Sequence, residues 1–222
     1  MVTSMDTANN KNQTRETLIE AAGQIFAEFG YEATTIRQIT VKAQANVAAV
    51  NYHFGDKLEL YRAVITDVMT ARSRLLAEQC AHGTPKARLR RFIEWMLPSG
   101  DGEHDSWKRA LVVREISLIQ QSKSTDLVPD LIRPVHQILG SIVRDLMGGG
   151  VSASDVEVTA HLVAALCTHW LHHSSLTQEL SPTLILGTGQ MDGVVEHIYQ
   201  FALAGVQRIS RLSKRAPEPN QD

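Results

Sequence analysis

Apolar residues recur at the spacing of helices along most of the chain, and no segment shows the two-residue alternation of a strand. The first helix shows the pattern most clearly, because its apolar and polar side chains fall on opposite sides. The apolar side carries Leu18, Ala22, Ile25, Phe26 and Phe29, and the polar side carries Glu16, Glu20, Gln24 and Glu28. Gly30 is expected to end this helix.

Longer amphipathic segments follow two short ones. The pattern predicts long helices over 56–80, 86–97, 106–121, 127–147, 152–176 and 190–212. Breaks rich in Gly and Pro separate them, such as PSGDGEH at 98–104 and GGG at 148–150. Pro134 predicts a turn or kink inside one of these segments. We expect an all-α fold, with an N-terminal three-helix helix-turn-helix head on a C-terminal helical bundle.

The two short helices and the tight turn between them are predicted within residues 34–61. Thr35 and Gln38 fit a capping box, in which each side chain satisfies a free backbone group. The turn contains Gln44, which lacks the easy access to positive φ that Gly has. A short helix, a turn and a second short helix form the arrangement that reads the major groove of DNA.

The second short helix has an apolar side and a free side. The wheel places Val47, Val50 and Phe54 on the apolar side, and Ala48, Asn51 and Tyr52 away from it. Small methyl groups let a helix approach the groove closely, and an Asn can pair with an adenine edge. We therefore expect Ala48, Ala49 and Asn51 to face base edges.

Phosphate contacts are expected at the edges of this unit. Lys57 lies in the first turn of the next helix, where a cation opposes the helix dipole. A role in binding phosphate would account for that placement. Tyr52 and Lys57 are expected to hold phosphates, with Thr34 or Thr35 at the start of the first short helix.

The run from Arg15 to Tyr61 resembles the head of the TetR family of transcriptional repressors. It carries FAEFGYEATT at 26–35 and YHFGDKLELY at 52–61. The run NVAAVNYHFGDK at 46–57 resembles the CecR-like subgroup, in which an Asn, here Asn51, replaces the first of the family's usual paired aromatic residues. The chain departs from the family in having Thr40 in place of Ala and Gln44-Ala45 in place of Gly-Val.

This resemblance implies a ligand-responsive DNA-binding regulator that acts as a repressor and that a small-molecule effector releases from a double-stranded, palindromic operator. It also implies a homodimer whose last two long helices pack with their mates as a four-helix bundle. The expected division is a disordered N-terminus (1–11), a DNA-binding domain (12–57), a ligand-binding and dimerisation domain (58–212) and a disordered tail (213–222).

Three sets of site residues follow. The DNA-binding set is Thr34, Thr35, Arg37, Asn46, Ala48, Ala49, Asn51, Tyr52, His53 and Lys57. The ligand-binding set is Trp107, Leu111, Arg114, Leu118, Met147, Cys167 and Trp170, although apolar side chains at helical spacing also fill ordinary cores. The dimer set is Leu162, Leu166, His169, His173, Val195, Ile198 and Ala202. In Arg114-Glu115 we see a resemblance to an Arg-Glu step of the subgroup, or else a salt-bridged pair.

Charge and composition change this interpretation little. The net charge is −2, and residues 1–57 hold five Lys and Arg against six Asp and Glu. DNA affinity must therefore come from a few well-placed donors rather than a broad basic field. Cys80 and Cys167 are too few for a disulfide scaffold. With no signal-peptide pattern and no apolar run long enough to span a bilayer, we expect a cytoplasmic protein.

Two alternatives stay open. His169, His172 and His173 share one helix face and could bind a metal, giving a metal-responsive regulator or a metal-binding helical protein. Packing or dimer contact is the simpler role for them. The departure at Gln44 also suits a helical adaptor that has lost DNA binding. No catalytic motif is found, so we expect no enzyme and no cofactor.

Overall fold

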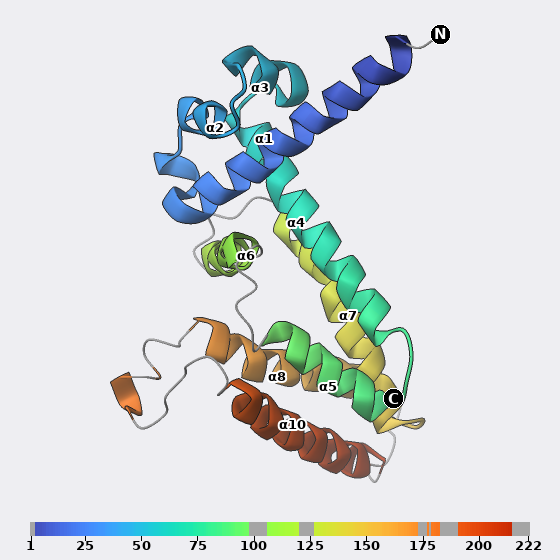
Figure 1. The fold of residues 1–222 in the computed structure, drawn as a ribbon. Helices are drawn as coiled ribbons and strands as arrows, with labels where there is room; N and C mark the ends of the chain where they lie inside the picture. Colours follow the sequence, from blue (N-terminus) through green and yellow to red (C-terminus); the bar gives the residue numbers. More distant parts are fainter. Residues whose placement is uncertain are drawn as a thin grey trace, which may run out of the picture. The chain divides into compact units, whose positions relative to one another are not determined.

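The computed structural model describes residues 3–97, 106–119, 127–172, 177, 179–182 and 191–214, with the backbone alone at 3–10, 116–119, 127–131 and 171–172. This part of the chain contains helices joined by turns and no strand, which confirms the predicted all-α fold (Figure 1). The helices are α1 (Thr3–Ala33), α2 (Ile36–Lys42), α3 (Val47–Phe54), α4 (Lys57–Cys80), α5 (Pro85–Met96), α6 (Ser106–Ile119), α7 (Leu127–Met147), α8 (Ala153–His172) and α10 (Met191–Ser213).

Two local expectations need correction. The chain is helical from Thr3, so the first helix begins well before residue 12, inside the segment that the sequence predicted to be disordered. The helix α7 also continues through Pro134, so no turn ends the helix at that residue. At Gly30 the backbone has φ 79°, a value that favours Gly and marks the kink near the end of α1. None of the described helices is long and apolar enough to cross a membrane.

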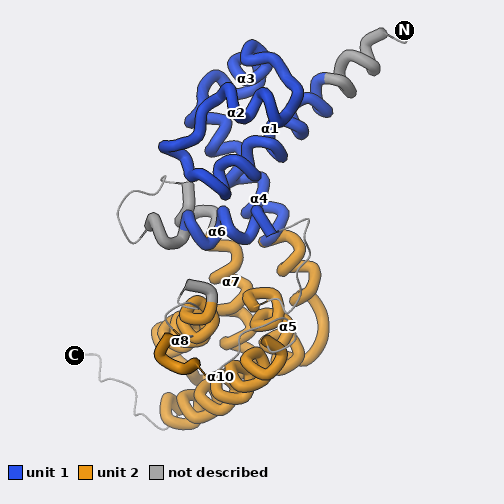
Figure 2. The backbone as a smooth tube through the Cα atoms, turned by 60° about the vertical axis from the view of Figure 1, so that its left-hand side comes forward, with its two compact units in different colours: residues 1–72, 102–131 blue, residues 73–101, 132–222 orange. Residues whose placement is uncertain are grey.

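The chain forms two compact units (Figure 2). The first, called the head unit, contains residues 1–72 and 102–131, and the second, called the body unit, contains 73–101 and 132–222. The head unit therefore includes α6 as well as the helix-turn-helix. The sequence placed the domain boundary at residue 57, directly after the motif, because it could not show that α6 packs on α1.

The head unit has a core of aliphatic and aromatic side chains. Leu18, Ile39, Val50 and Leu60 are fully buried, so one side chain from each of its first four helices is in the core. The Tyr61 ring packs edge-on against Phe26, with ring centroids 4.8 Å apart, and lies 5.0 Å from the ring of Tyr31. The apolar stripe predicted for the first helix is thus the surface on which the motif folds.

The body unit has a larger core shared by α5, α7, α8 and α10. The helix α10 packs on both α5 and α8. Its contribution to the core is a stripe of buried side chains: Val195, Ile198, Tyr199, Ala202 and Val206. Phe92 of α5 and Cys167 of α8 lie in the same core, and burial raises the pKa of the Cys167 thiol to about 12.

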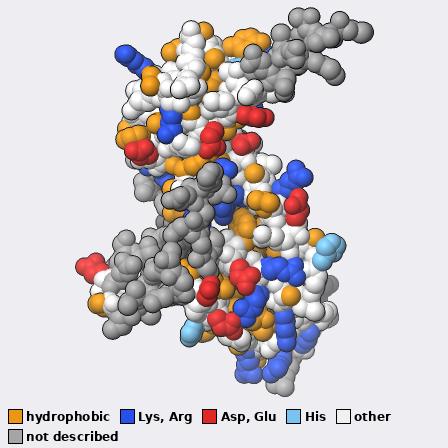
Figure 3. All heavy atoms as spheres, in the orientation of Figure 1, with side chains coloured by type: hydrophobic (Ala, Val, Ile, Leu, Met, Phe, Trp, Pro, Cys, Tyr) orange, Lys and Arg blue, Asp and Glu red, His pale blue; other side chains and the backbone are white. Residues whose placement is uncertain are grey.

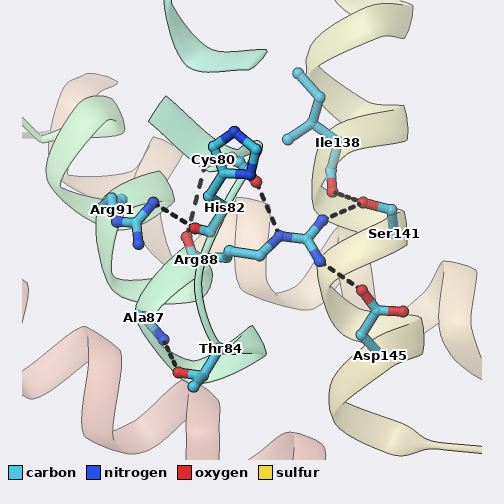
Figure 4. A network of polar contacts seen from close by, with 9 residues as sticks. All are labelled: Cys80, His82, Thr84, Ala87, Arg88, Arg91, Ile138, Ser141 and Asp145. Atoms are coloured by element: carbon cyan, nitrogen blue, oxygen red, sulfur yellow. Dashed lines mark hydrogen bonds and ion pairs between the residues drawn. The ribbon is translucent and has the colours of Figure 1, made fainter. Parts of the chain in front are cut away.

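Two arginines of α5 bind the carboxyl end of α4 (Figure 4). The Arg88 guanidinium donates to the Cys80 carbonyl oxygen (3.0 Å), to Ser141 Oγ (3.0 Å) and to an oxygen of Asp145 (2.5 Å). Arg91 donates to the His82 carbonyl oxygen at 2.8 Å. Carbonyl groups at a helix end lack partners within the helix, so these donors satisfy them and join α4, α5 and α7.

Candidate nucleic-acid interface

Local hydrogen bonds cap both ends of α2. Thr35 Oγ1 accepts from the Gln38 backbone N–H at 3.3 Å, while the Gln38 side chain accepts from the Thr35 N–H at 2.8 Å. This confirms the predicted capping box. At the other end of α2, the N–H groups of Gln44 and Ala45 donate to the carbonyls of Val41 and Thr40. That pair of bonds is a Schellman motif, which reverses the chain toward α3.

Gln44 occupies the position of this motif that usually holds Gly. Its φ is 52°, and it is the only non-Gly residue with positive φ in the described part of the chain. The turn keeps its helix-ending geometry although Gln has a Cβ that disfavours it. The departure from the family sequence therefore adds local strain without altering the motif.

The helix α3 presents a surface of small and polar side chains. Asn46 caps it by accepting from the Ala48 N–H at 3.0 Å, and the N–H of Gly55 donates to the Asn51 carbonyl at 3.0 Å. Val50 is completely buried, whereas Tyr52 is 69% exposed. Val47, which the wheel placed on the apolar side, is instead 46% exposed.

The structure sorts the predicted DNA-binding residues by exposure. The exposed ones are Thr35, Arg37, Asn46, Ala48, Asn51 and Tyr52, and the half-buried ones are Ala49, His53 and Lys57. Thr34 does not fit a role at the DNA surface, since it is 1% exposed and its hydroxyl donates to the Gly30 carbonyl at 2.6 Å. It closes the kinked end of α1 instead.

Lys57 is engaged within the head unit. Its Nζ donates to the carbonyl oxygens of Tyr31 (2.9 Å) and Thr34 (3.0 Å), and lies 4.3 Å from the centre of the Tyr31 ring. The ammonium therefore joins the end of α1 to the start of α4. This contact gives an internal reason for a cation in the first turn of α4, and the phosphate role of Lys57 stays a prediction.

Two basic residues of α1 lie against α3, which sequence reasoning did not anticipate. Lys11 Nζ is 4.8 Å from the centre of the Tyr52 ring, and the Arg15 guanidinium carbon is 5.5 Å from the centre of the Phe54 ring. The spacing of four residues puts both on one face of α1. On the face drawn in Figure 3, the described Lys and Arg side chains over the head unit stand apart from one another and form no continuous basic patch.

The helix α6 packs on α1 and α4 of the same head unit. The Trp107 ring occupies the space beside Gly23, and Trp107 Nε1 donates to Glu20 Oε1 at 3.0 Å. The Arg114 guanidinium lies against Gly30 at the kink of α1. Glu115 is 3% exposed and accepts a hydrogen bond from the hydroxyl of Tyr61 on α4. Burial raises the pKa of Glu115, although the Tyr61 hydrogen bond opposes the shift.

The predicted ligand set does not fall within one compact unit. Trp107, Leu111 and Arg114 belong to the head unit, where Leu111 is buried and Trp107 faces α1. Met147 and Cys167 are buried in the core of the body unit, so they fill that core rather than line an open pocket. Trp170 is half-buried there, and the side chain of Leu118 lies outside the described residues.

The predicted dimer set divides between two faces. Val195, Ile198 and Ala202 lie in the protomer's own core, so they cannot form the seam with a partner. Leu162 is 54% exposed, Leu166 is half-buried and His169 is exposed; His173 lies outside the described residues. The exposed apolar side chains of α8 and α10 that sequence reasoning missed are Val158, Phe201 and Leu212.

The described side chains contain no group of three His, Cys, Asp or Glu arranged to hold a metal ion. Neither His172 nor His173 has a described side chain, so the metal alternative of the sequence analysis is not tested at its centre. His161 stacks on His136 of α7, with ring centroids 4.3 Å apart.

The chain matches two described families. Residues 18–64 match "Bacterial regulatory proteins, tetR family", and residues 85–206 match "HTH-type transcriptional dual regulator CecR, C-terminal domain". The first match contains α2 and α3, and the second extends from the start of α5 into the second half of α10. Together they cover the helix-turn-helix and more than half of the chain.

Curated relatives match mainly at the head. The dual regulator CecR of Shigella flexneri is 47% identical over 51 residues, which are 23% of this chain and 22% of that protein. The repressor AcnR of Corynebacterium efficiens is 34% identical over 61 residues, covering 28% of this chain and 32% of the relative. These matches thus span less than two thirds of either relative.

Solved structures match over most of the fold. A putative regulator from Saccharomonospora viridis, solved in complex with choline, has a TM-score of 0.62 at 22% identity. The match covers 86% of this chain and 95% of that one. At this identity the likeness supports the fold alone.

Proposed function

The chain belongs to the TetR family of DNA-binding transcriptional regulators and is of the CecR-like type, and we propose that it acts as a homodimeric repressor released from its operator by a small-molecule effector. The family consists of regulators rather than enzymes, in agreement with the sequence analysis. The proposed site of action is the cytoplasm, where the operator would lie.

The observation that carries the proposal is the exposed surface of α3. It combines the exposed side chains of Ala48, Asn51 and Tyr52 with the half-buried Ala49. The buried Val50 anchors the opposite side of the helix. Such a surface can enter a major groove and contact base edges, because it has no bulky charged group in the way. Asn51 is the proposed reader of an adenine edge, and Tyr52 the proposed phosphate contact.

Exposed apolar side chains support the proposed dimer. Val158 and Leu162 lie one turn apart on α8 and are 57% and 54% exposed, and Phe201 on α10 is 71% exposed. A two-fold dimer would bring the same patch of each protomer together and would present two heads to a palindromic operator. We propose that this patch, rather than the buried stripe of α10, forms the seam.

The effector would act by preferring one state of the dimer. It can shift the equilibrium only by the difference between its affinities for the DNA-bound and free conformations. Support for a repressor comes from the name of AcnR, and support for a small molecule comes from the choline complex of the Saccharomonospora structure. Because α6 contacts α1, on which α2 and α3 also pack, a shift of α6 within the head unit would act directly on the helix that supports the motif.

Electrophoretic mobility shift with duplex DNA from the region upstream of the chain's own gene tests the proposal. The parent protein should bind this duplex far more tightly than an unrelated one of the same length. Asn51→Ala should cost about 1–3 kcal/mol at one base pair of each half-site. Gln79→Ala, which removes an exposed amide on α4 in the body unit, provides a control outside the proposed interface. Equal affinity for both duplexes by the parent would contradict operator recognition.

A further inference from the structure

The N-terminal part of α1 lies beside the proposed recognition helix. The helix begins at Thr3, and its exposed Lys11 side chain meets the exposed ring of Tyr52 at 4.8 Å. One turn further, Arg15 meets the half-buried ring of Phe54 at 5.5 Å. Lys11 therefore lies at the exposed edge of α3 that carries Tyr52, whereas Arg15 lies against Phe54 on the packed side of the same helix.

The chemistry of the Lys11 contact leaves its charge available. An aromatic face attracts an ammonium through its quadrupole but carries no formal negative charge. N–H groups directed away from the ring can still donate to an anion. Lys57 differs, because its ammonium already donates to two carbonyl oxygens inside the head unit. Of these two lysines, Lys11 is the more exposed and the freer to bind a phosphate.

Arg15 and Lys42 have different surroundings. Together with Glu16, Glu20 and Asp67 they line an open cavity of about 570 Å³. Carboxylates in such a place would repel a phosphodiester backbone. Lys11 is absent from that lining and stands at the edge of α3 instead.

We propose that Lys11 binds a phosphate of the operator backbone and that the Tyr52 ring positions it there, so that the DNA interface extends from α3 onto α1. This inference rests on the proposed function. It assigns Tyr52 a second task, since the ring would hold a cation while the phenol hydroxyl contacts the backbone. A phosphate contact carries no sequence information, so Lys11 would add affinity for all duplexes.

Fluorescence anisotropy of the full chain with labelled duplexes over a range of KCl concentrations tests the proposal. Lys11→Ala should weaken binding several-fold to the operator and to an unrelated duplex alike. It should also lower the slope of log affinity against log salt by about one for each head bound. Lys11→Arg should keep both the affinity and the slope. The control Lys42→Ala removes one positive charge beside the carboxylates and should leave the slope unchanged.

A double-mutant cycle separates the role of the Tyr52 ring, which positions Lys11, from the role of the Lys11 charge. Tyr52→Phe keeps the ring and should preserve the effect of Lys11→Ala, whereas Tyr52→Leu should reduce it. Circular dichroism of each variant checks that α-helical content is retained. If the parent binds DNA and Lys11→Ala leaves affinity and slope unchanged, the Lys11 contact is refuted. If the parent itself binds no duplex, the proposed function is refuted instead.

Discussion

Local hydrogen bonds define the two short helices of the head unit, whereas packing by distant helices orients the long helix α10 of the body unit. In the head, Thr35 and Gln38 bond to one another across three residues, and Asn46 caps α3 from two residues away. In α10, Ile198 and Phe201 are both large and apolar and lie within one turn, yet one is 6% and the other 71% exposed. Capping depends on neighbours in sequence, whereas the choice of the buried face depends on which helices pack against it.

Polar contacts repeat this difference. The bonds of the capping box form within one turn of chain. The contact of Tyr61 with Glu115 joins residues that are 54 positions apart, and the Arg88 contact with Asp145 spans 57. Local contacts can therefore be predicted from spacing alone. Distant contacts require the fold first, and their buried members are the ones whose loss should be most harmful.

The largest expected effect comes from a charge placed on the buried face of α10. Ile198→Asp should destabilise the body unit by about 3–5 kcal/mol, because the carboxylate would be buried without a partner. Urea unfolding followed by circular dichroism measures this change. Ile198→Val is the volume control and should cost only about 0.5–1.5 kcal/mol. A stable, fully helical Ile198→Asp protein would show that this face is accessible to water after all.

On the exposed face of the same helix, Phe201→Asp should give a different result. Helical content should be retained, because the new carboxylate faces water once the two protomers have separated. Sedimentation velocity should show a shift from dimer to monomer, and operator binding should fall with it. A Phe201→Asp protein that still sediments as a dimer would exclude the proposed seam.

A smaller effect is expected at the contact between Tyr61 and Glu115. Tyr61→Phe leaves a buried carboxyl group without its donor and should cost about 1–3 kcal/mol. Phe29→Leu, at a partly exposed position of α1, should change stability much less. Thermal unfolding at neutral pH compares the two. If both variants unfold at the parent's temperature, the hydrogen bond does not stabilise the head unit.

The same contact predicts a pH dependence. Burial raises the pKa of Glu115, so the folded state binds its proton more tightly than the unfolded state, where a Glu titrates near ~4.3. The stability linked to this proton is fully present below ~4.3 and is lost as the pH rises through the higher folded pKa. Glu115→Gln should remove that part of the dependence when the unfolding free energy is measured across this window. An unchanged pH profile would mean that Glu115 is not the group responsible.

The smallest expected effect concerns the turn. Gln44→Gly should raise stability by about 0.5–1 kcal/mol, because Gly adopts positive φ without the steric cost of a Cβ, partly offset by its greater freedom in the unfolded chain. Gln44→Ala keeps the Cβ and should be nearly neutral. The urea midpoints of the parent and the two variants measure the difference. If Gln44→Gly lowers the free energy of unfolding, the Gln side chain stabilises the turn by more than its positive φ destabilises it.

Much of the architecture follows from the sequence alone. The all-α class, the helix-turn-helix, its caps and the order of the long helices rest on periodicity and on pairs such as Thr35 with Gln38. The exposure of Ala48, Asn51 and Tyr52 also follows, because the apolar Val50 identifies the side of the helix that faces the core. These features depend on interactions within one or two turns, which a sequence records directly.

Tertiary structure decided the features that depend on which surfaces meet. It buried Thr34 at the kink of α1, joined Lys57 to two carbonyl groups and placed Lys11 beside Tyr52. It also turned Ile198 inward and Phe201 outward. A helix with apolar residues on two faces is compatible with either choice. The neighbouring helices remove one face from water, and the face left exposed is the one available to a partner.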